Sequence, residues 1–418
     1  MLKSRSPLVV IFITIFIDLV GFGLVIPVLP LYAEKFGASE MVVGLLLSVY
    51  SVMQFIFSPV LGRISDRVGR RPVLLYSLIG TSIGFLVMGF AHTLWLLFVA
   101  RIIDGITGGN ISTAQAYIAD VTPPDQRSRG MGLIGAAFGL GFIVGPALGG
   151  LLSQISPEAP FLFAAALAAV NATALYFLLP ESLTAEHRSQ ANQRESLSRL
   201  FENSGGWQLG AVMATYFFAT VAFAMLTATF ALFTNQRFGY DAAHNGYLFA
   251  YFGVLGAVIQ GGLLGRLSKA FGDKPLAVVG TAIFTISLLA LPLSTSLLLL
   301  LITTTGVTIG NSLVTPTLNA MASKSVSASE QGRVLGVMSS AASFARIIGP
   351  ALGGFLLGMD PHDFSIYGRT PYWVSGALML VALGLAVTLN STVRDTSRET
   401  IRTEERSTDA ASTDAARK

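Results

Sequence analysis

Three charged residues that could carry proton chemistry lie inside long apolar stretches of this sequence: Asp18, Arg101 and Asp104. Asp18 is ten residues into the first stretch, about 15 Å along a helix that rises ~1.5 Å per residue. A charge within a bilayer costs about 2.5–3.5 kcal/mol or more, so it is expected to face a cavity or a partner. Because burial disfavours the carboxylate, such an aspartate can take up and release a proton near neutral pH. We therefore predict that Asp18 and Asp104, tuned by Arg101, carry out proton coupling.

Other interpretations of these three residues stay open. Arg101 and Asp104 are three residues apart, so they share a helix face, partly neutralise each other and could be a purely structural ion pair. Asp18 could be a protonated or capped aspartate that bonds a neighbouring helix. Four further polar residues in apolar stretches are candidates for substrate binding: Gln54, Gln260, Asn311 and Arg346. Arg346 could hold an anionic group, or pair with Asp18 or Asp104.

The composition indicates an all-α polytopic membrane protein. The 418 residues are 52% hydrophobic and 12% charged, about half the charge of a soluble chain. Their apolar residues form runs long enough to cross a bilayer as helices. We predict twelve transmembrane helices: 8–31, 42–61, 73–91, 94–119, 130–153, 160–179, 208–234, 245–268, 276–293, 297–320, 331–357 and 372–390.

Charge in the connections predicts the orientation and the division of the chain. With both termini in the cytoplasm of a multi-pass cell-membrane protein, the inner connections hold 16 Lys and Arg, the tail 6 and the outer connections 3. Membrane orientation therefore explains the basic balance, and we expect no nucleic-acid partner. No cleavable signal peptide is evident, and the absence of cysteine excludes thiol chemistry. We predict a six-helix half at 1–179, a cytoplasmic linker at 180–206, a second half at 207–390 and a disordered tail at 391–418.

An internal repeat relates the two predicted halves. The basic stretch 62–72 recurs in degraded form at 265–274, and the Gly-Pro-Ala-Leu-Gly-Gly sequence at 145–150 recurs at 349–354. The offset between copies stays between 201 and 204 residues. Duplicated halves are typical of transporters in which one half rocks against the other around a midplane site.

The basic stretch between the second and third apolar segments is a candidate gate. Gly62 would let helices approach, Asp66 could face a helix N-terminus, and the arginines could pair with Asp66, Asp120 or lipid. The stretch resembles the G-x-x-x-D-R-x-G-R-R loop signature of the major facilitator superfamily, although membrane topology alone could also explain its charges. The residues that the resemblance assigns to gating are Gly62, Asp66, Arg67, Gly69, Arg70 and Arg71.

The fifth apolar segment is rich in glycine. Gly135, Gly139, Gly145 and Gly149 would form small-x-x-x-small pairs on one flank, and Pro146 would allow a bend. Helix packing alone could explain this composition, but the pattern also resembles an element of the family's antiporters. The positions that match it are Gly141, Gly145, Pro146, Gly149 and Gly150.

Residues 1 to about 150 resemble the tetracycline-efflux-type drug/proton antiporters of this family. The resemblance is carried by the segments around Asp18–Pro30, Gln54, Ser65–Leu75, Arg101 and Ile118–Thr122. It implies alternating-access export of small amphiphilic compounds or drugs by proton antiport. The chain departs from the pattern at Gly84, Gly256 and Phe284, where those exporters carry aspartate, histidine and aspartate, so tetracycline is doubtful as the substrate.

The expected partners are therefore a small-molecule substrate, protons and the lipid bilayer, with no cofactor and no metal, and we expect a monomer. The alternative is an importer or an organic-anion exchanger of the same family that uses Arg101 and Arg346. Motifs of hydrolases, metalloproteases and ATP-binding loops are absent, so we do not expect an enzyme.

Overall fold

A computed structural model of the whole chain describes residues 7–123, 127–182, 207–326, 330–363 and 365–389. Most of the predicted linker and all of the predicted tail lie outside these residues. The described helices follow one another along the chain as α1 (Pro7–Glu34), α2 (Glu40–Val68), α3 (Arg70–Gly89), α4 (Leu94–Thr107), α5 (Asn110–Val121), α6 (Arg127–Ser153), α7 (Ala159–Leu178), α9 (Trp207–Phe238), α10 (Ala242–Val258), the π-helix η3 (Ile259–Leu263), α11 (Leu264–Phe271), α12 (Asp273–Ala290), the 3-10 helix η4 (Leu291–Leu293), α13 (Leu297–Lys324), α14 (Gln331–Leu357) and α15 (Arg369–Thr388).

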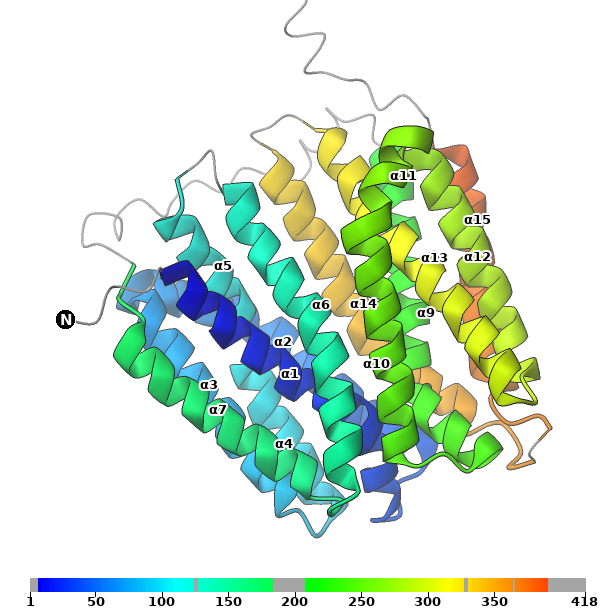
Figure 1. Cartoon of the computed structure of the whole chain (residues 1–418), viewed down its shortest axis with the longest axis horizontal. Helices are drawn as coiled ribbons and strands as arrows, with labels where there is room; N and C mark the ends of the chain where they lie inside the picture. Colours follow the sequence, from blue (N-terminus) through cyan, green and yellow to red (C-terminus); the bar gives the residue numbers. More distant parts are fainter. Residues whose placement is uncertain (1–6, 124–126, 183–206, 327–329, 364, 390–418) are drawn as a thin grey trace, which may run out of the picture.

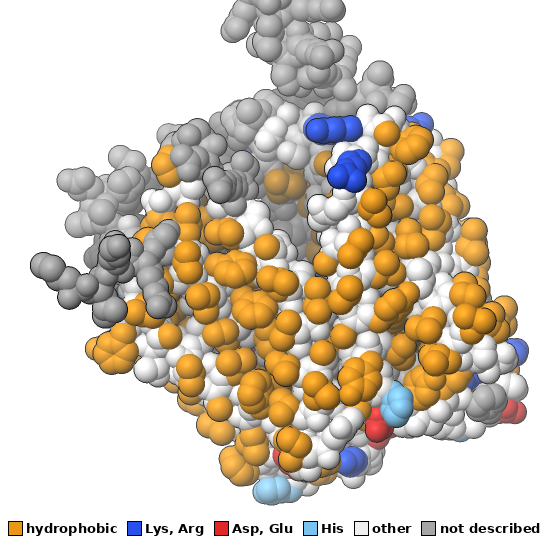
Figure 2. Space-filling view, in the orientation of Figure 1, with side chains coloured by type: hydrophobic (Ala, Val, Ile, Leu, Met, Phe, Trp, Pro, Cys, Tyr) orange, Lys and Arg blue, Asp and Glu red, His pale blue; other side chains and the backbone are white. Residues whose placement is uncertain are grey.

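Twelve helical spans in the described part of the chain are long and apolar enough to cross a membrane, which confirms the predicted fold class. Two of them are interrupted. The span Leu94–Val121 comprises α4 and α5, which meet at Gly108 and Gly109, and the span Ala242–Phe271 comprises α10, η3 and α11. Figure 2 shows hydrophobic side chains over most of the visible face, while the Lys, Arg, Asp, Glu and His side chains gather near the two ends, as expected for a protein that spans a bilayer.

The basic stretch 62–72 is almost entirely helical, although we predicted a link between helices. The helix α2 continues to Val68 and α3 begins at Arg70, so the chain turns at Gly69 alone. Gly69 has φ of 123°, a conformation that residues with a Cβ rarely adopt. The charged residues are therefore held on two rigid helix ends.

The spans form two groups, α1–α7 and α9–α15, which we call the first and second groups (Figure 1). In the first group α6 packs along α1, and in the second α14 packs along α9. The same two helices make the most extensive contacts between groups, since α6 also packs against α10 and α14 against α2, while α1 contacts α9 and α10 to a lesser extent. We call these two contacts the α6–α10 and α2–α14 seams.

Glycines of the repeated Gly-Pro sequence make both seams close. A Cβ on Gly149 would lie 2.6 Å from Leu24 O of α1, whereas one on the adjacent Gly150 would lie 3.0 Å from Ala243 O of α10. One α6 glycine therefore serves packing within the group and its neighbour serves the seam.

In the second copy of the sequence, one glycine again packs within its own group and the next glycine packs at the seam. A Cβ on Gly353 would lie 3.1 Å from Thr229 of α9, and one on Gly354 would lie 2.3 Å from Glu40 O of α2. Close packing of α6 on α1 involves Gly141 and Gly145, where a Cβ would meet Leu19 and Val20. The predicted contribution of Gly135 and Gly139 is wrong for this conformation, because no described atom lies within 4 Å of a Cβ at either position.

The seams are tight toward one end of the bundle only. We call the end with the Gly69 turn the basic end, and the end where α1 connects to α2 the opposite end. Toward the opposite end, Ser48 Oγ donates to Ile347 O over 2.8 Å, and Glu40 accepts from Tyr367 Oη over 3.2 Å. Toward the basic end, nothing described lies within 4 Å of a Cβ at Gly62, Gly132, Gly262 or Gly336. The groups are therefore closed at the opposite end and separated at the basic end.

Candidate functional site

Asp18 lies in α1 on the side facing α4 and α5. The residue is partly exposed, and the Asn110 side chain at the start of α5 forms a hydrogen bond with its carboxylate. Asp104 lies close enough for the two negative charges to repel each other. Asp18 thus combines a neutral hydrogen-bond partner, a nearby like charge and access to solvent.

Arg101 and Asp104 form the ion pair that their spacing predicts. Arg101 Nη1 donates to Asp104 Oδ2 over 3.0 Å, and the two side chains are only 2% and 7% exposed. The guanidinium also stacks over the Tyr50 ring of α2, with its Cζ 4.3 Å from the ring centroid. Arg101 Nε is buried and has no hydrogen-bond partner among the described residues. The pair is therefore a desolvated dipole fixed between α2 and α4.

Helix α3 leaves room for this pair through Gly84. A Cβ at position 84 would lie 3.2 Å from the Asp104 Cβ and 3.2 Å from Ala100 O. The Thr81 hydroxyl, one turn earlier, forms a hydrogen bond with the Asp104 carboxylate. A side chain at position 84 would therefore press on α4 at Asp104, and α4 would have to move by a few tenths of an ångström to make room for it.

Gln54 and Tyr50 connect α2 to the break between α4 and α5. Gln54 Nε2 donates to the Gly108 carbonyl over 2.8 Å and to the Tyr50 hydroxyl over 3.2 Å. The carbonyl of Gly108 is available because α4 ends at Thr107. Tyr50 is also in ring contact with Phe22 of α1, at a centroid distance of 5.6 Å. Gln54 thus orients the tyrosine that lies beside the Arg101–Asp104 pair.

Arg346 brings a positive charge from the second group to the same region. It lies near the middle of α14 and is exposed, although Tyr50 and Tyr216 lie within electrostatic range of its guanidinium. Its Nη2 donates to Ser343 Oγ over 3.1 Å, and it forms no ion pair within the described ranges. The predicted alternatives of pairing with Asp18 or Asp104 are wrong for this conformation. Arg346 instead faces the space between the groups.

Gln260 and Asn311 lie together on the second group. Gln260, in the π-helix η3, is exposed, and its Nε2 donates to Ser312 Oγ over 3.4 Å. Asn311, adjacent to Ser312 on α13, accepts from Thr315 Oγ1 over 3.2 Å. A π-turn inside a helix is often found at functional positions because it re-aims one side chain. Gln260 and Asn311 therefore belong to the second group of helices, whereas Asp18, Arg101 and Asp104 belong to the first.

The gating residues form a network within the first group. Arg70 is only 9% exposed, and it donates from Nη1 to Asp66 over 2.5 Å and from Nε to Asp120 over 3.1 Å. Arg71 stacks over Tyr176 of α7 and donates to its carbonyl. The network therefore ties the α2–α3 turn to α5 and α7.

Two of the predicted contacts in this stretch are wrong. The carboxylate at the N-terminus of α3 is Glu181 and not Asp66: it accepts from the backbone N–H of Arg70 over 2.9 Å and of Arg71 over 3.2 Å. Gly62 allows no close helix approach in this conformation, because no described atom lies within 4 Å of a Cβ there. Arg67 is exposed.

The second group contains a copy of this network with inverted charge. Asp273 begins α12 after Gly272, as Arg70 begins α3 after Gly69, and both glycines have positive φ. Asp273 pairs with Lys324 over 2.6 Å and accepts from Ser268 over 2.5 Å. By the repeat offset Lys324 corresponds to Asp120 and Ser268 to Ser65, which itself accepts from Arg70 over 2.7 Å. The ion pair is thus present in both copies with its polarity reversed.

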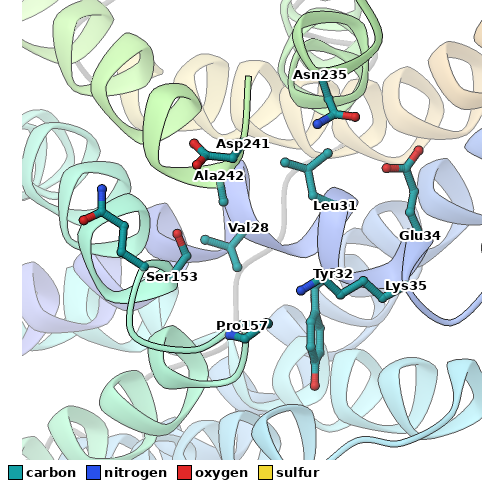
Figure 3. A pocket seen from close by; sticks show the side chains of 11 residues that line it. Val28, Leu31, Tyr32, Glu34, Lys35, Ser153, Pro157, Asn235, Asp241 and Ala242 are labelled. Carbon is teal, nitrogen blue, oxygen red and sulfur yellow. The ribbon is translucent and has the colours of Figure 1, made fainter. Parts of the chain in front are cut away.

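A cavity of about 460 Å³ lies at the opposite end, between α1, the α6–α7 connection, α9 and the start of α10. Figure 3 shows the apolar side chain of Leu31 between those of Asp241 and Glu34, with Val28 below Asp241. Residues from both groups line it, and none of the predicted site residues is among them. The cavity is therefore separate from the region around Asp18, Arg101 and Asp104.

Sequence reasoning missed five residues of these networks. Tyr50 and Glu181 carry no signal of their own, because their partners are distant along the chain. Asn110 likewise carries no signal, because Asp18 lies 92 positions before it in the chain. Asp273 and Lys324 could have been found by comparing the copies residue by residue and allowing the charges to exchange.

Known proteins resemble this chain over nearly its whole length. The sequence matches the family model described as Major Facilitator Superfamily over residues 11–266 and 257–415. It is 35% identical over 391 residues to the "Tetracycline resistance protein, class C" of Escherichia coli, covering 91% of this chain and 96% of that protein. It is 30% identical over 395 residues to the "Multidrug resistance protein 2" of Bacillus subtilis (strain 168), covering 92% and 95%.

Solved structures share the arrangement of helices. The human organic anion transporter MFSD10 (TETRAN) matches with a TM-score of 0.68 and 25% identity, covering 92% of this chain and 100% of that one. An inward-facing, occupied bacterial homolog of the human lysosomal transporter Spinster matches with a TM-score of 0.76 and 15% identity, covering 91% and 95%. The second likeness concerns the fold alone.

Proposed function

Because the chain belongs to the major facilitator superfamily, we propose that it is a secondary transporter that exports small amphiphilic compounds or drugs in exchange for protons. Relatives named for tetracycline resistance and multidrug resistance support export, and they make drugs the first compounds to test. The proposal uses no cofactor, and it needs only protons, a substrate and the bilayer.

The observation that carries the proposal is the environment of Asp18. The neighbouring Arg101–Asp104 pair is already neutral as a unit, so it does not supply Asp18 with a dedicated counter-ion. A proton on Asp18 removes the repulsion from Asp104, and a cationic group of a substrate does the same. Proton and substrate therefore compete for one carboxylate, which is the elementary requirement for exchange.

Movement of the two groups of helices relative to each other is the conformational change that transport requires. We place the basic end in the cytoplasm, following the excess of Lys and Arg in the connections at that end. The conformation described above then admits substrate from the cytoplasm. Separation of the α2–α14 and α6–α10 seams, with closure of the basic end, releases it outside. The network around Arg70 keeps the basic end of the first group rigid during this movement.

Everted membrane vesicles test this function. Vesicles that contain the protein should accumulate tetracycline or rhodamine 123 when their lumen is acidified, and collapse of the pH gradient should stop the accumulation. Asp18→Asn should abolish it while the protein stays folded. Glu158→Gln is the matched control, because it removes a carboxylate from the connection between α6 and α7.

Three results would contradict the proposal. Accumulation that does not depend on the pH gradient would rule out exchange for protons. Full activity of Asp18→Asn would rule out the proposed role of the Asp18 carboxylate. Uptake only into right-side-out vesicles would favour the alternative of an importer. An organic-anion exchanger that uses two arginines is less favoured by the geometry, because Arg101 is buried against Asp104 and only Arg346 is available to a solute.

A further inference from the structure

Among the residues that the structure describes, two opposite charges near the middle of the membrane have no ion-pair partner. Asp18 on α1 is partly exposed and bonded by the neutral Asn110. Arg346 on α14 is exposed and bonded by the neutral Ser343. The remaining charges of the region, Arg101 and Asp104, satisfy each other.

Tyr50 lies close to both of these charges, because Ser48, two residues before it on α2, donates to the carbonyl of Ile347 beside Arg346 over 2.8 Å. On its other side the Tyr50 ring contacts Phe22, one helical turn after Asp18 on α1. The Tyr50 side chain lies within electrostatic range of Asp18 on the first group and of Arg346 on the second. The tyrosine is itself held in place, by Gln54 at its hydroxyl and by the Arg101 guanidinium over its ring. Phe22 contacts Tyr50 on one side and Phe142 of α6 on the other, with centroid distances of 5.6 and 6.2 Å. A rigid aromatic surface therefore lies beside a negative pole and a positive pole.

The charge balance of the site selects one class of substrate. The four charged side chains sum to zero when Asp18 is ionised and to +1 when it is protonated. A plain anion would bind best to the protonated site and would therefore travel with the proton and not against it. A plain cation would compete with the proton at Asp18 but would be repelled by Arg346. A substrate with both charges satisfies both poles.

We propose that the transported substrate is an aromatic zwitterion whose cationic group displaces the proton from Asp18 while its carboxylate binds Arg346. This inference rests on the proposed function and names the substrate class of the same site. The proton leaves Asp18 for the solvent as the cation arrives, and no covalent bond changes. Because the two poles belong to different groups of helices, a bound zwitterion also draws α1 and α14 together. Substrate binding itself then favours closure of the basic end.

A matched pair of dyes tests the proposal. Rhodamine 110 carries a delocalised cation and a free carboxylate, and rhodamine 123 is its methyl ester, which keeps the cation alone. Fluorescence polarisation on the purified protein should show about tenfold tighter binding of rhodamine 110, because a charge-assisted bond to Arg346 is available only to the free carboxylate.

Substitution of Arg346 tests whether this one positive charge causes the preference for rhodamine 110. Arg346→Gln should remove the preference by weakening the binding of rhodamine 110, while rhodamine 123 should bind as tightly as before or more tightly because the repelling charge is gone. Arg346→Lys should retain part of the preference. Arg266→Gln, which removes an exposed arginine near the basic end, should leave the preference intact.

The zwitterion proposal is overturned if the wild type binds the ester as tightly as the free carboxylate, or binds neither. It is also overturned if Arg346→Gln weakens both dyes equally. Failure of the proposed function is a different result: both dyes bind with the stated preference, but neither accumulates in vesicles in response to a pH gradient.

Discussion

A single methyl group at Gly354 should open the α2–α14 seam. A Cβ at this position would lie 2.3 Å from Glu40 O and 2.9 Å from Gly44 Cα, about 1 Å and about 0.5 Å short of an ordinary contact of 3.4 Å. Both obstructing atoms belong to the backbone, so no side chain can rotate away. Overpacking of this kind costs about 1–3 kcal/mol. Since the clash exists only while the opposite end is closed, Gly354→Ala should shift the conformational equilibrium toward opening there by about 5–150-fold.

Spin labels can measure this shift cleanly because the chain has no cysteine. Cysteines at His92, between α3 and α4, and at Leu298, on α13, place one label on each group near the opposite end, at exposed positions. Gly354→Ala should move the distance distribution between the labels to longer values. The control is Gly336→Ala on the same helix, where no described atom lies within 4 Å of the new methyl group. An unchanged distribution, or an equal shift in the control, would refute the steric argument.

Two predictions concern the ion pairs. Asp104→Asn leaves the buried Arg101 guanidinium without a carboxylate, so it should destabilise the protein by about 3–5 kcal/mol in detergent unfolding measurements. The double variant Asp104→Leu with Arg101→Met should recover most of this loss, because it removes both buried charges. Equal stability of Asp104→Asn and the wild type would contradict this. Arg70→Gln should lower the unfolding temperature more than Lys324→Gln does. The Arg70 side chain is 9% exposed and has two acidic partners. The Lys324 side chain is 62% exposed, so its ion pair with Asp273 is worth only about 0–1 kcal/mol. The reverse order of the two variants would show that burial does not set the strength of these pairs.

Features that depend on nearby residues were predictable from the sequence. Apolar length sufficed for twelve spans, because a bilayer requires every backbone group to be bonded within its own helix. The spacing of Arg101 and Asp104 sufficed for their ion pair. The family was also recognisable from its motifs, which the similarity to known proteins confirms.

Features that depend on distant residues were not predictable. Glu181 replaces Asp66 at the N-terminus of α3, and it lies more than a hundred positions along the chain from the amides that it caps. Glycine spacing indicated close packing of α6, but the partner of each glycine follows from how helices cross, so Gly150 contacts α10 while Gly135 contacts nothing described. The partners of Arg346 depend on how far the groups are separated, which no local pattern encodes.

The central claim is that a proton and the substrate exchange at Asp18, and proton release on binding tests it most directly. Purified protein in a weakly buffered solution at a pH where Asp18 holds its proton would be mixed with saturating rhodamine 110, and a pH indicator would count the protons released. The wild type should release about one proton per molecule, by the linkage between ligand and proton binding. Asp18→Asn should release none while it still binds the dye through Arg346. Binding without proton release in the wild type, or equal release from Asp18→Asn, would contradict the exchange.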